Sequence, residues 1–452
     1  MMRSGSLLLF LGLTFSLFRG SEAGENAARA LSLREALELA NAHSYQILIS
    51  ESQQKEAAGQ NLEAWRAYLP QLIVSERGVR SNDPVSVFGI KLRQGIFTQS
   101  DFNLSQLNDP DRIDNFTTAI ELRQPLINPD AIFGKSAAGS AAKAGEFALA
   151  RTKETVALGV ENAYYTLVLT HGNLKTIEQA VKSAETHHRE VEAAYDKGLV
   201  SEADLLSSGV RLAEMEEERL TAGLDIANSE DHLKYLLGIE DAASIVPTDS
   251  LAITARDFDA PDVSLDTVPE GRSDLMALRY QNEAAQKNLW MRRGEWIPRL
   301  NVFGLTQWDD EEVFGTTKNH WTMGFVLEWN LLDGLGRWGR TGQAGARAAA
   351  VRTQYGEARA RSAMEIRRAY RSLVTARERV GVAEKAAGQS RESLRIVEAR
   401  FQQGLERVSE LIDKESASTN AQLRLQKATY DFKIAQSELK FYLGAASKPS
   451  SR

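Results

Sequence analysis

The segment Tyr195-Asp196-Lys197-Gly198-Leu199 recurs 206 residues later as Phe401-Gln402-Gln403-Gly404-Leu405. The same offset continues downstream, where Leu205-Leu206 corresponds to Leu411-Ile412. A period this long exceeds the roughly 20 to 50 residues of a solenoid repeat unit. It therefore indicates duplication of a whole module, and the chain is expected to have two similar halves.

The amino terminus has the pattern of an export signal. Arg3 precedes the apolar run 7–18, and Ser21-Glu22-Ala23 resembles a cleavage site with small residues. This run is too short for a membrane-spanning helix, and a buried core segment is the alternative interpretation. The expected division is a signal peptide at 1–23, a first repeat at 24–240, a linker at 241–270, a second repeat at 271–445 and a disordered tail at 446–452.

Composition excludes several classes of function. The net charge of -7 offers no basic face for nucleic acid. The absence of cysteine excludes disulfides, thiolate metal sites, a cysteine nucleophile and a lipid anchor on an amino-terminal cysteine. Serine, histidine and acidic residues do not cluster at a telling spacing. We therefore expect neither an enzyme nor a cofactor.

Each half contains a long stretch without proline, between Pro129 and Pro247 and between Pro298 and Pro449. Apolar residues recur there every seven positions, as in Val160, Leu167, Leu174, Val181 and in Ile366, Leu373, Val380, Ala387, Leu394, Phe401. Such heptads predict coiled-coil helices. A helix over about 131–197 would be roughly 100 Å long.

Glycine is expected to end each long helix. Gly198 and Gly404 suit the left-handed C-terminal cap, and Ser201 and Ser409 are candidate caps of the helices that return. Each half is therefore expected to contain an antiparallel helical hairpin with its tip at the glycine.

A β segment precedes each hairpin. In the second half, alternate positions are apolar and tryptophan occurs at both ends, at Trp321, Met323, Phe325, Leu327 and Trp329. This alternation is typical of a transmembrane barrel strand that faces lipid on one side, and a sheet on a soluble core is the alternative. Four strands are expected, at about 71–82, 115–126, 300–309 and 319–332. The fold class is thus mainly α with transmembrane β.

Four strands cannot close a membrane barrel, because the smallest have about eight. An open edge in lipid leaves backbone groups unpaired. We therefore expect oligomerisation, with eight strands from two copies or twelve from three.

Three further motifs are interpreted as structural. Gly334-Leu335-Gly336-Arg337-Trp338-Gly339 fits a dinucleotide-binding pattern, but no second parallel strand follows to complete that fold. His187, His188 and Glu192 could suggest a metal site, although helix packing or a partner contact is the favoured role. The acidic run 309–312 lacks calcium-loop spacing and is expected to be a solvated loop.

A set of motifs covers essentially the whole mature chain, and their order is more specific than any one of them. They are the start at Leu31–Leu37, the Leu-Pro junctions at Pro70 and Pro298, the segments 124–128 and 330–334, and the two Gly-Leu tips. In this order the chain resembles the TolC-type outer-membrane efflux proteins of Gram-negative bacteria. The resemblance implies a homotrimer with a twelve-strand barrel in outer-membrane lipid above a periplasmic tunnel of coiled-coil helices.

The resemblance also implies a periplasmic gate lined by acidic side chains of the returning helices. The matching residues are Asp204, Glu410 and Asp413. Glu410 and Asp413 are three apart and share a helix face, so threefold symmetry would stack them into negative rings. Solvated surface charge is the alternative. The chain departs from the pattern at Glu406, where some members have a basic latch residue, and Arg407 stands beside it.

The function implied is a passive exit duct of a tripartite efflux pump or type I secretion system. Its partners would be a periplasmic adaptor and an inner-membrane pump or ABC transporter. Adaptor contacts are expected at the tips, at Gly198, Leu199, Gly404 and Leu405. The alternative is an exported structural coiled-coil protein that bridges envelope surfaces without conduction, but such a bridge needs no lipid-facing strands.

Overall fold

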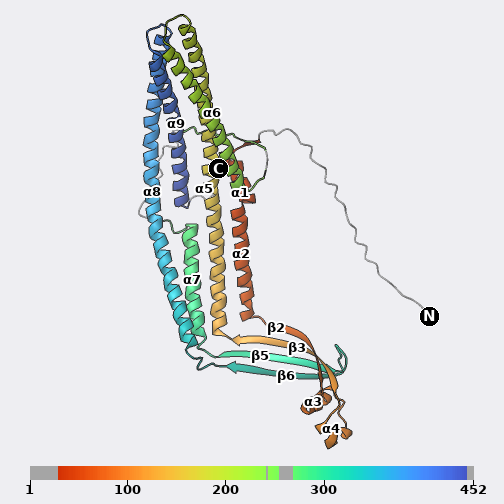
Figure 1. The fold of residues 1–452 in the computed structure, drawn as a ribbon. Coiled ribbons are helices and arrows are strands. Elements are labelled where there is room, and N and C mark those ends of the chain that lie inside the picture. Colours follow the sequence, from red (N-terminus) through yellow and green to blue (C-terminus); the bar gives the residue numbers. More distant parts are fainter. Residues whose placement is uncertain (1–28, 241–242, 254–267, 445–452) are drawn as a thin grey trace, which may run out of the picture.

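The computed structural model describes residues 29–240, 243–253 and 268–444, and the expected signal peptide and tail lie outside these residues. The described chain forms a long helical rod (Figure 1). A four-stranded sheet lies at one end of the rod and two helical hairpin tips lie at the other. Most of the expected linker also lies outside the described residues.

Two long helices run the length of the rod without interruption. They are α5 Pro129–Tyr195, of 67 residues, and α8 Gly336–Phe401, of 66 residues. At 1.5 Å per residue, each is about 100 Å long. Shorter helices accompany them: α1 Leu33–His43, α2 Tyr45–Glu63, α6 Glu202–Leu237, α7 Ser273–Gly294 and α9 Val408–Tyr442.

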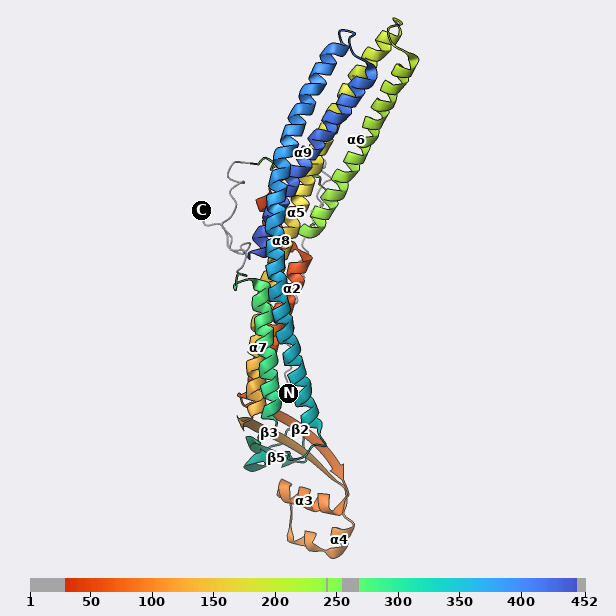
Figure 2. The same cartoon turned by 90° about the vertical axis from the view of Figure 1, so that its left-hand side faces the viewer.

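The duplication is visible in this arrangement. In each half one long helix packs with one short helix near the sheet and with another near the tips: α5 with α2 and α6, and α8 with α7 and α9 (Figure 2). Across the upper half the order is α6, α5, α9, α8, and across the lower half it is α2, α5, α7, α8. The edges of the helical layer are therefore α8 on one side and α2 followed by α6 on the other. Among the helices in the described ranges, none combines the length and apolar composition needed to cross a membrane.

The sheet contains β2 Gln71–Ser81, β3 Ile113–Ile127, β5 Arg299–Asp310 and β6 Lys318–Glu328, in that order and antiparallel throughout. The fourth strand is shorter than the expected 319–332. It ends at Glu328, so Trp329 follows the strand and donates its indole Nε1 hydrogen to the Trp296 carbonyl at 3.1 Å. The expectation of a strand residue at Trp329 is wrong, because the chain turns there toward α8.

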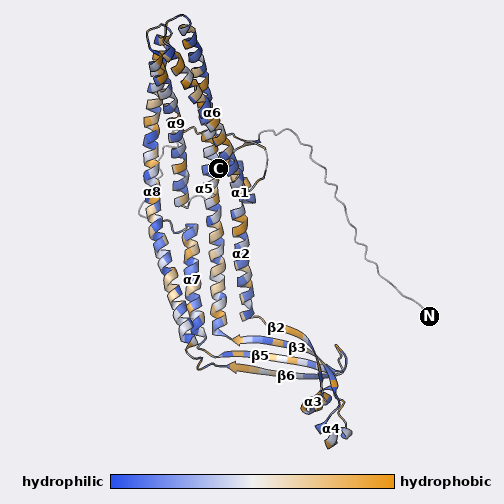
Figure 3. Ribbon diagram, viewed as in Figure 1, coloured by the Kyte–Doolittle hydropathy of each residue, from blue (hydrophilic) through white to orange (hydrophobic). Residues whose placement is uncertain are grey.

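The strand register separates the two faces of the sheet. Trp321 lies opposite Thr306, which lies opposite Ile120, and Ile120 lies opposite Val74. This face carries the exposed apolar side chains Leu72, Val74, Leu122, Trp321, Met323, Phe325 and Leu327. The other face is mostly polar, with Glu121, Arg123, Asn301, Gln307 and Thr322 among its residues. Figure 3 shows hydrophobic residues along β2 and β6, whereas the long helices alternate in hydropathy.

A set of long-range contacts, called the belt, lies at mid-length of the rod, where the short helices of each half meet. Strand β1 Arg29–Leu31 pairs in parallel with β4 Ile245–Pro247. The Tyr164 hydroxyl of α5 lies 2.9 Å from the Leu31 carbonyl oxygen and 2.7 Å from Asp249 Oδ2. The first repeat is thus tied to the linker at this level.

The second repeat contributes Arg272 to the belt. Its side chain is 1% exposed, and it donates to Asp274 Oδ2 at 2.6 Å and to the Tyr442 carbonyl at 3.0 Å. Glu365 of α8 lies 3.5 Å from the same guanidinium group. Burial opposes the charged form of Arg272, but these acidic partners outweigh it and raise its pKa.

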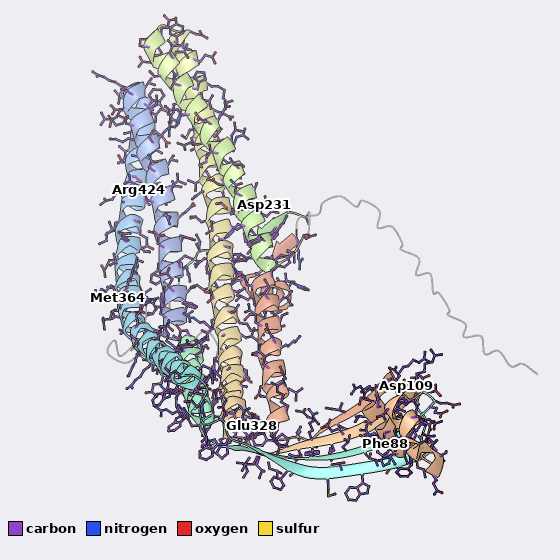
Figure 4. All side chains as sticks on the ribbon, turned by 60° about the horizontal axis from the view of Figure 1, so that its bottom comes forward. Phe88, Asp109, Asp231, Glu328, Met364 and Arg424 are labelled. Carbon is purple, nitrogen blue, oxygen red and sulfur yellow. The ribbon has the colours of Figure 1, made fainter. Side chains whose placement is uncertain are left out.

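Between β2 and β3 the chain forms two short helices, α3 Pro84–Gln94 and α4 Leu104–Asn108, which the sequence analysis does not expect. They lie at the end of the sheet away from the rod, where Figure 4 labels Phe88 and Asp109. The expectation of a solvated loop at 309–312 is wrong for its first two residues, which end β5. Asp309 is fully buried, since Asn115 and Thr117 each donate a hydrogen bond of 2.8 Å to its Oδ1.

A testable consequence concerns Gly238, which ends α6 with a φ of 69°. A Cβ at this position would meet the His43 carbonyl oxygen where α1 joins α2. Left-handed backbone costs a residue other than glycine about 1 to 2 kcal/mol, before any clash. Gly238→Ala should therefore lower the melting temperature of the purified protein, followed by far-ultraviolet circular dichroism.

The matched control is Gly223→Ala in the interior of α6, where an added Cβ meets nothing within 4 Å. Alanine is favoured over glycine in a helix by about 1 kcal/mol, so this variant should be at least as stable as the wild type. Equal destabilisation by both substitutions would contradict the role given to Gly238.

Candidate functional site

The two hairpin tips have the same backbone geometry. Gly198 has a φ of 69° and Gly404 a φ of 72°. After each glycine the next amide closes the helix end: Leu199 N–H donates to Ala194 O at 2.9 Å, and Leu405 N–H donates to Arg400 O at 2.9 Å. An added Cβ would meet nothing at either glycine, so glycine is needed there for its conformation and not for space.

The starts of the returning helices differ between the two tips. Ser201 caps α6: its hydroxyl accepts from the Asp204 N–H, and the Asp204 carboxylate accepts from the Ser201 N–H at 3.1 Å. At the second tip the cap residue is Arg407, and Ser409 lies inside the first turn of α9. The prediction of Ser409 as a cap is wrong. Ser201 directly precedes the first residue of α6, whereas Ser409 is the second residue of α9.

One exposed leucine stands at each tip. Leu199 and Leu405 both follow the left-handed glycine, and both side chains are mostly exposed. Adaptor contacts are expected at these two positions.

The acidic pair of the second hairpin points away from the helices that pack α9. Val408, Leu411 and Glu415 are buried, whereas Asp413 is exposed and Glu410 is partly exposed on the opposite side. Glu410 forms an ion pair with Lys414 at 2.8 Å, a partner that the sequence analysis does not identify. Lys414 therefore offsets the charge of Glu410 more directly than that of Asp413.

Opposite charges also lie between the two tips. Hydrogen bonds with Ser201 lower the pKa of Asp204, and the positive charge of Arg407 in the other hairpin lowers it further. Glu406 instead pairs with Arg400 of its own hairpin at 3.2 Å. Asp204 thus lies near Arg407 of the other hairpin, and it also forms the capping box of α6.

Below the tips, His187 of α5 contacts the Glu415 carboxylate of α9, and both side chains are mostly buried. Burial disfavours the charged imidazole, but Glu415, together with Glu190 of α5 and Glu398 of α8, raises the pKa of His187. Burial raises the pKa of Glu398; the His187 cation opposes this shift, and the charges of Glu415 and Glu190 add to it. This cluster connects the hairpin of the first repeat to that of the second.

The neighbouring histidine has a different partner. His188 Nδ1 lies 2.8 Å from the Ser208 hydroxyl of α6, within the first hairpin. No group of three histidine or acidic side chains in the part of the chain that the structure describes is arranged to hold a metal ion. The contacts of His187 and His188 instead join α5 to α9 and to α6. The pairing of His187 with Glu415 is not predicted by the sequence. A heptad pattern shows which side of a helix is buried, but it does not give the register of one hairpin against the other.

Comparison with known proteins gives consistent results. Residues 265–445 match the family model described as outer membrane efflux protein. The chain is 20% identical to outer membrane protein TolC of Vibrio cholerae over 75% of this chain and 79% of that protein. It is 23% identical to the alkaline protease secretion protein AprF of Pseudomonas aeruginosa, over 92% and 86% of the two chains.

The fold also matches solved structures. The CmeC outer membrane channel of Campylobacter jejuni superposes with a TM-score of 0.80 at 17% identity, over 95% of this chain and 87% of that one. At this identity the match shows the fold. The rod, the hairpins and the four-stranded sheet are therefore features that this chain shares with a known channel.

A pH experiment tests the His187 cluster. Because the pKa of His187 is raised above its ordinary value of 6.5, its contribution to stability is full below pH 6.5 and is lost as the pH rises through the raised pKa. Amide protection of the first turns of α9, corrected for intrinsic exchange, should fall severalfold as the pH rises through this range. His187→Gln should abolish that dependence.

The control is His188→Gln, which removes a histidine of the same helix that does not contact Glu415. It should keep the pH dependence. An unchanged pH profile in His187→Gln would show that another group titrates.

Proposed function

With the resemblance to the TolC-type outer-membrane efflux proteins confirmed, we propose that this protein is the outer-membrane exit duct of a tripartite efflux pump or type I secretion system. It lies in the outer membrane of a Gram-negative bacterium, and most of its mass is in the periplasm. Three copies form the duct, which is gated at the hairpin tips. A periplasmic adaptor and an inner-membrane pump or ABC transporter complete the assembly.

One observation carries the proposal: the sheet has an exposed apolar face and two unpaired edges. Within the described chain β2 pairs only with β3, and β6 pairs only with β5. The strands have 11 to 15 residues, enough to cross a bilayer, which requires about 9 to 11 residues in a tilted strand. In lipid each open edge would cost several kcal/mol per unpaired backbone group.

Neighbouring copies satisfy both edges, one on each side. Strand β2 leads away from the helices and β6 leads toward them, so β6 of one copy and β2 of the next are antiparallel neighbours. Three copies then give twelve strands and leave no edge, the number that the resemblance implies. Head-to-tail contacts form a ring when the rotation between neighbouring copies closes, as it does with three copies here.

The helical layer has matching edges. On α6 an apolar stripe lies opposite the buried face of the helix and consists of Leu206, Val210, Leu220 and Leu224. On α8 the corresponding exposed residues are Met364, Val374, Val382 and Ile396. Because α6 lies above the β2 side and α8 lies above the β6 side, one rotation brings strand edges and helix edges together.

The ring places the acidic residues of the second tip three times around one axis. We assign cation preference mainly to Asp413, because Lys414 neutralises Glu410 at 2.8 Å. Leu199 and Leu405 are the proposed adaptor contacts. We assign no catalytic activity, since the relatives are a secretion protein and outer-membrane proteins. A structural bridge is not favoured, because it gives no use to an exposed apolar sheet face.

The ring is tested at the α6 edge. Leu220→Lys with Leu224→Lys should convert the trimer to monomers in native mass spectrometry, because each leucine buried in the interface is worth about 1.5 to 3 kcal/mol. Leu199→Lys is the control: it adds charge to an equally exposed leucine at a tip and should leave the trimer intact. A trimer that tolerates the double substitution would place the interface elsewhere.

The duct and its gate are tested by single-channel recording in planar bilayers. The wild type should give small cation-selective currents. Asp413→Asn should reduce the cation preference severalfold, Glu410→Gln should reduce it less, and Lys414→Gln should increase it. A folded trimer that inserts no conducting unit would contradict the proposed function.

A further inference from the structure

The two short helices between β2 and β3 lie on the polar face of the sheet. Gln94 of α3 donates from Nε2 to the Asn115 Oδ1 and to the Asp114 carbonyl, both at 2.9 Å. The His320 ring Nε2 lies 2.8 Å from the Arg93 carbonyl. Asn115 and His320 alternate with the apolar-face residues Phe116 and Trp321, so α3 covers the opposite face.

The segment is a folded unit and not an open loop. Asp83 caps α3 by accepting from the Ser86 N–H at 2.8 Å, and Gly95 ends it with a φ of 70°. Lys91 forms an ion pair with Asp101 at 2.7 Å. The rings of Phe88, Phe97 and Phe102 pack edge to face, with centroids 5.0 and 5.3 Å apart. The unit therefore presents a defined surface.

The surface turned away from the sheet is apolar. Val87, Ile90 and Gln94 are buried against the strands, while Val85 and Leu92 lie on the opposite side of α3. Val85 is 79% exposed and Leu104 at the start of α4 is 76% exposed. Leu92 is half exposed and Phe102 is mostly exposed. Four exposed apolar side chains on one small folded unit indicate a surface that a partner covers.

We propose that the α3–α4 units of the three copies cover one another on the axis and form an outer gate at the external mouth of the duct. This inference rests on the proposed function, in which the apolar face of the sheet points to lipid and the polar face lines the lumen. The unit lies on the lumen side, so its apolar surface faces water or another copy, and lipid is excluded. Each unit follows directly from β2, the strand at the ring interface.

The outer gate would be separate from the gate at the tips. In Figure 4, Glu328 marks the end of β6 near the rod, and Phe88 of α3 lies beyond the other end of the sheet. The two gates therefore lie at opposite ends of the molecule. A solute released from the tips would thus meet a second closure, which is held by apolar contacts and not by acidic rings.

Cross-linking tests the contact between copies. The chain has no cysteine, so Leu104→Cys creates a single thiol per copy. In the purified trimer a short bismaleimide should join two copies in most trimers. Met323→Cys, exposed on the lipid face, is the matched control and should not cross-link.

The outcomes distinguish this inference from the proposed function. An intact, conducting trimer in which neither Leu104→Cys nor Phe102→Cys cross-links would overturn the outer gate and leave the duct. A monomeric protein would overturn both.

Closure is tested by access from outside the cell. Val326→Cys places a thiol on the lumen face of β6, deeper than His320. A polyethylene-glycol maleimide added to whole cells should label this thiol slowly. Adding Phe102→Asp and Leu104→Asp should raise the labelling rate severalfold, because like charges separate the three units. Equal labelling rates with and without the aspartates would show that the mouth is open.

Discussion

A backbone amide or carbonyl in hydrocarbon requires a hydrogen-bond partner, and the outer edges of β2 and β6 have none within the described chain. This requirement governs the rest of the structure. In the proposed ring it brings copies together at the sheet, and the direction of the strands makes the contact head to tail. The helices above have the same order as the strands, since α8 continues from the β6 side and α6 lies above the β2 side. In that ring a continuous wall runs from the sheet to the tips.

Duplication explains how one chain builds such a wall. Each half supplies one uninterrupted helix, α5 or α8, and two short helices placed end to end beside it. The short helices stop at mid-length, and their ends are fixed there by buried polar contacts such as those of Tyr164 and Arg272. The halves are similar in architecture but differ in charge at the tips, where Asp204 belongs to one hairpin and Arg407 to the other.

Much of this could be predicted from the sequence because it depends on local pattern. Heptads and the absence of proline predict the long helices, Gly198 and Gly404 predict the tips, and alternation predicts β6. The motifs in order predict the family. The roles given to Asp204, Glu410 and Asp413 stay predictions until the currents are measured.

Other features depend on tertiary contacts or on weak signals. The three-residue strands β1 and β4 are too short for periodicity. The pairing of His187 with Glu415 depends on how the two hairpins align. Helix α3 has a signal in the sequence, with a start at Asp83-Pro84 and an end at Gly95. This short helix lies between two expected strands, and the sequence analysis does not expect a helix there. Asp309 is expected to be solvated because it lies in an acidic run. In the structure it is buried and accepts hydrogen bonds from Asn115 and Thr117, which are distant in sequence.

The belt at mid-length has a mechanical consequence. Helices α5 and α8 cross it unbroken, while every helix beside them ends there, so each long helix is a lever with its fulcrum at the belt. From Tyr164 to the end of α5 at Tyr195 the arm is roughly 45 Å at 1.5 Å per residue. A tilt of about 5° at the fulcrum would displace the tip by about 4 Å on that helical rise. Because α5 is continuous, the same tilt would move its other end at Pro129, about 50 Å from the fulcrum, by a similar distance in the opposite direction. Movement of the tips is therefore coupled to movement at the sheet end of the rod.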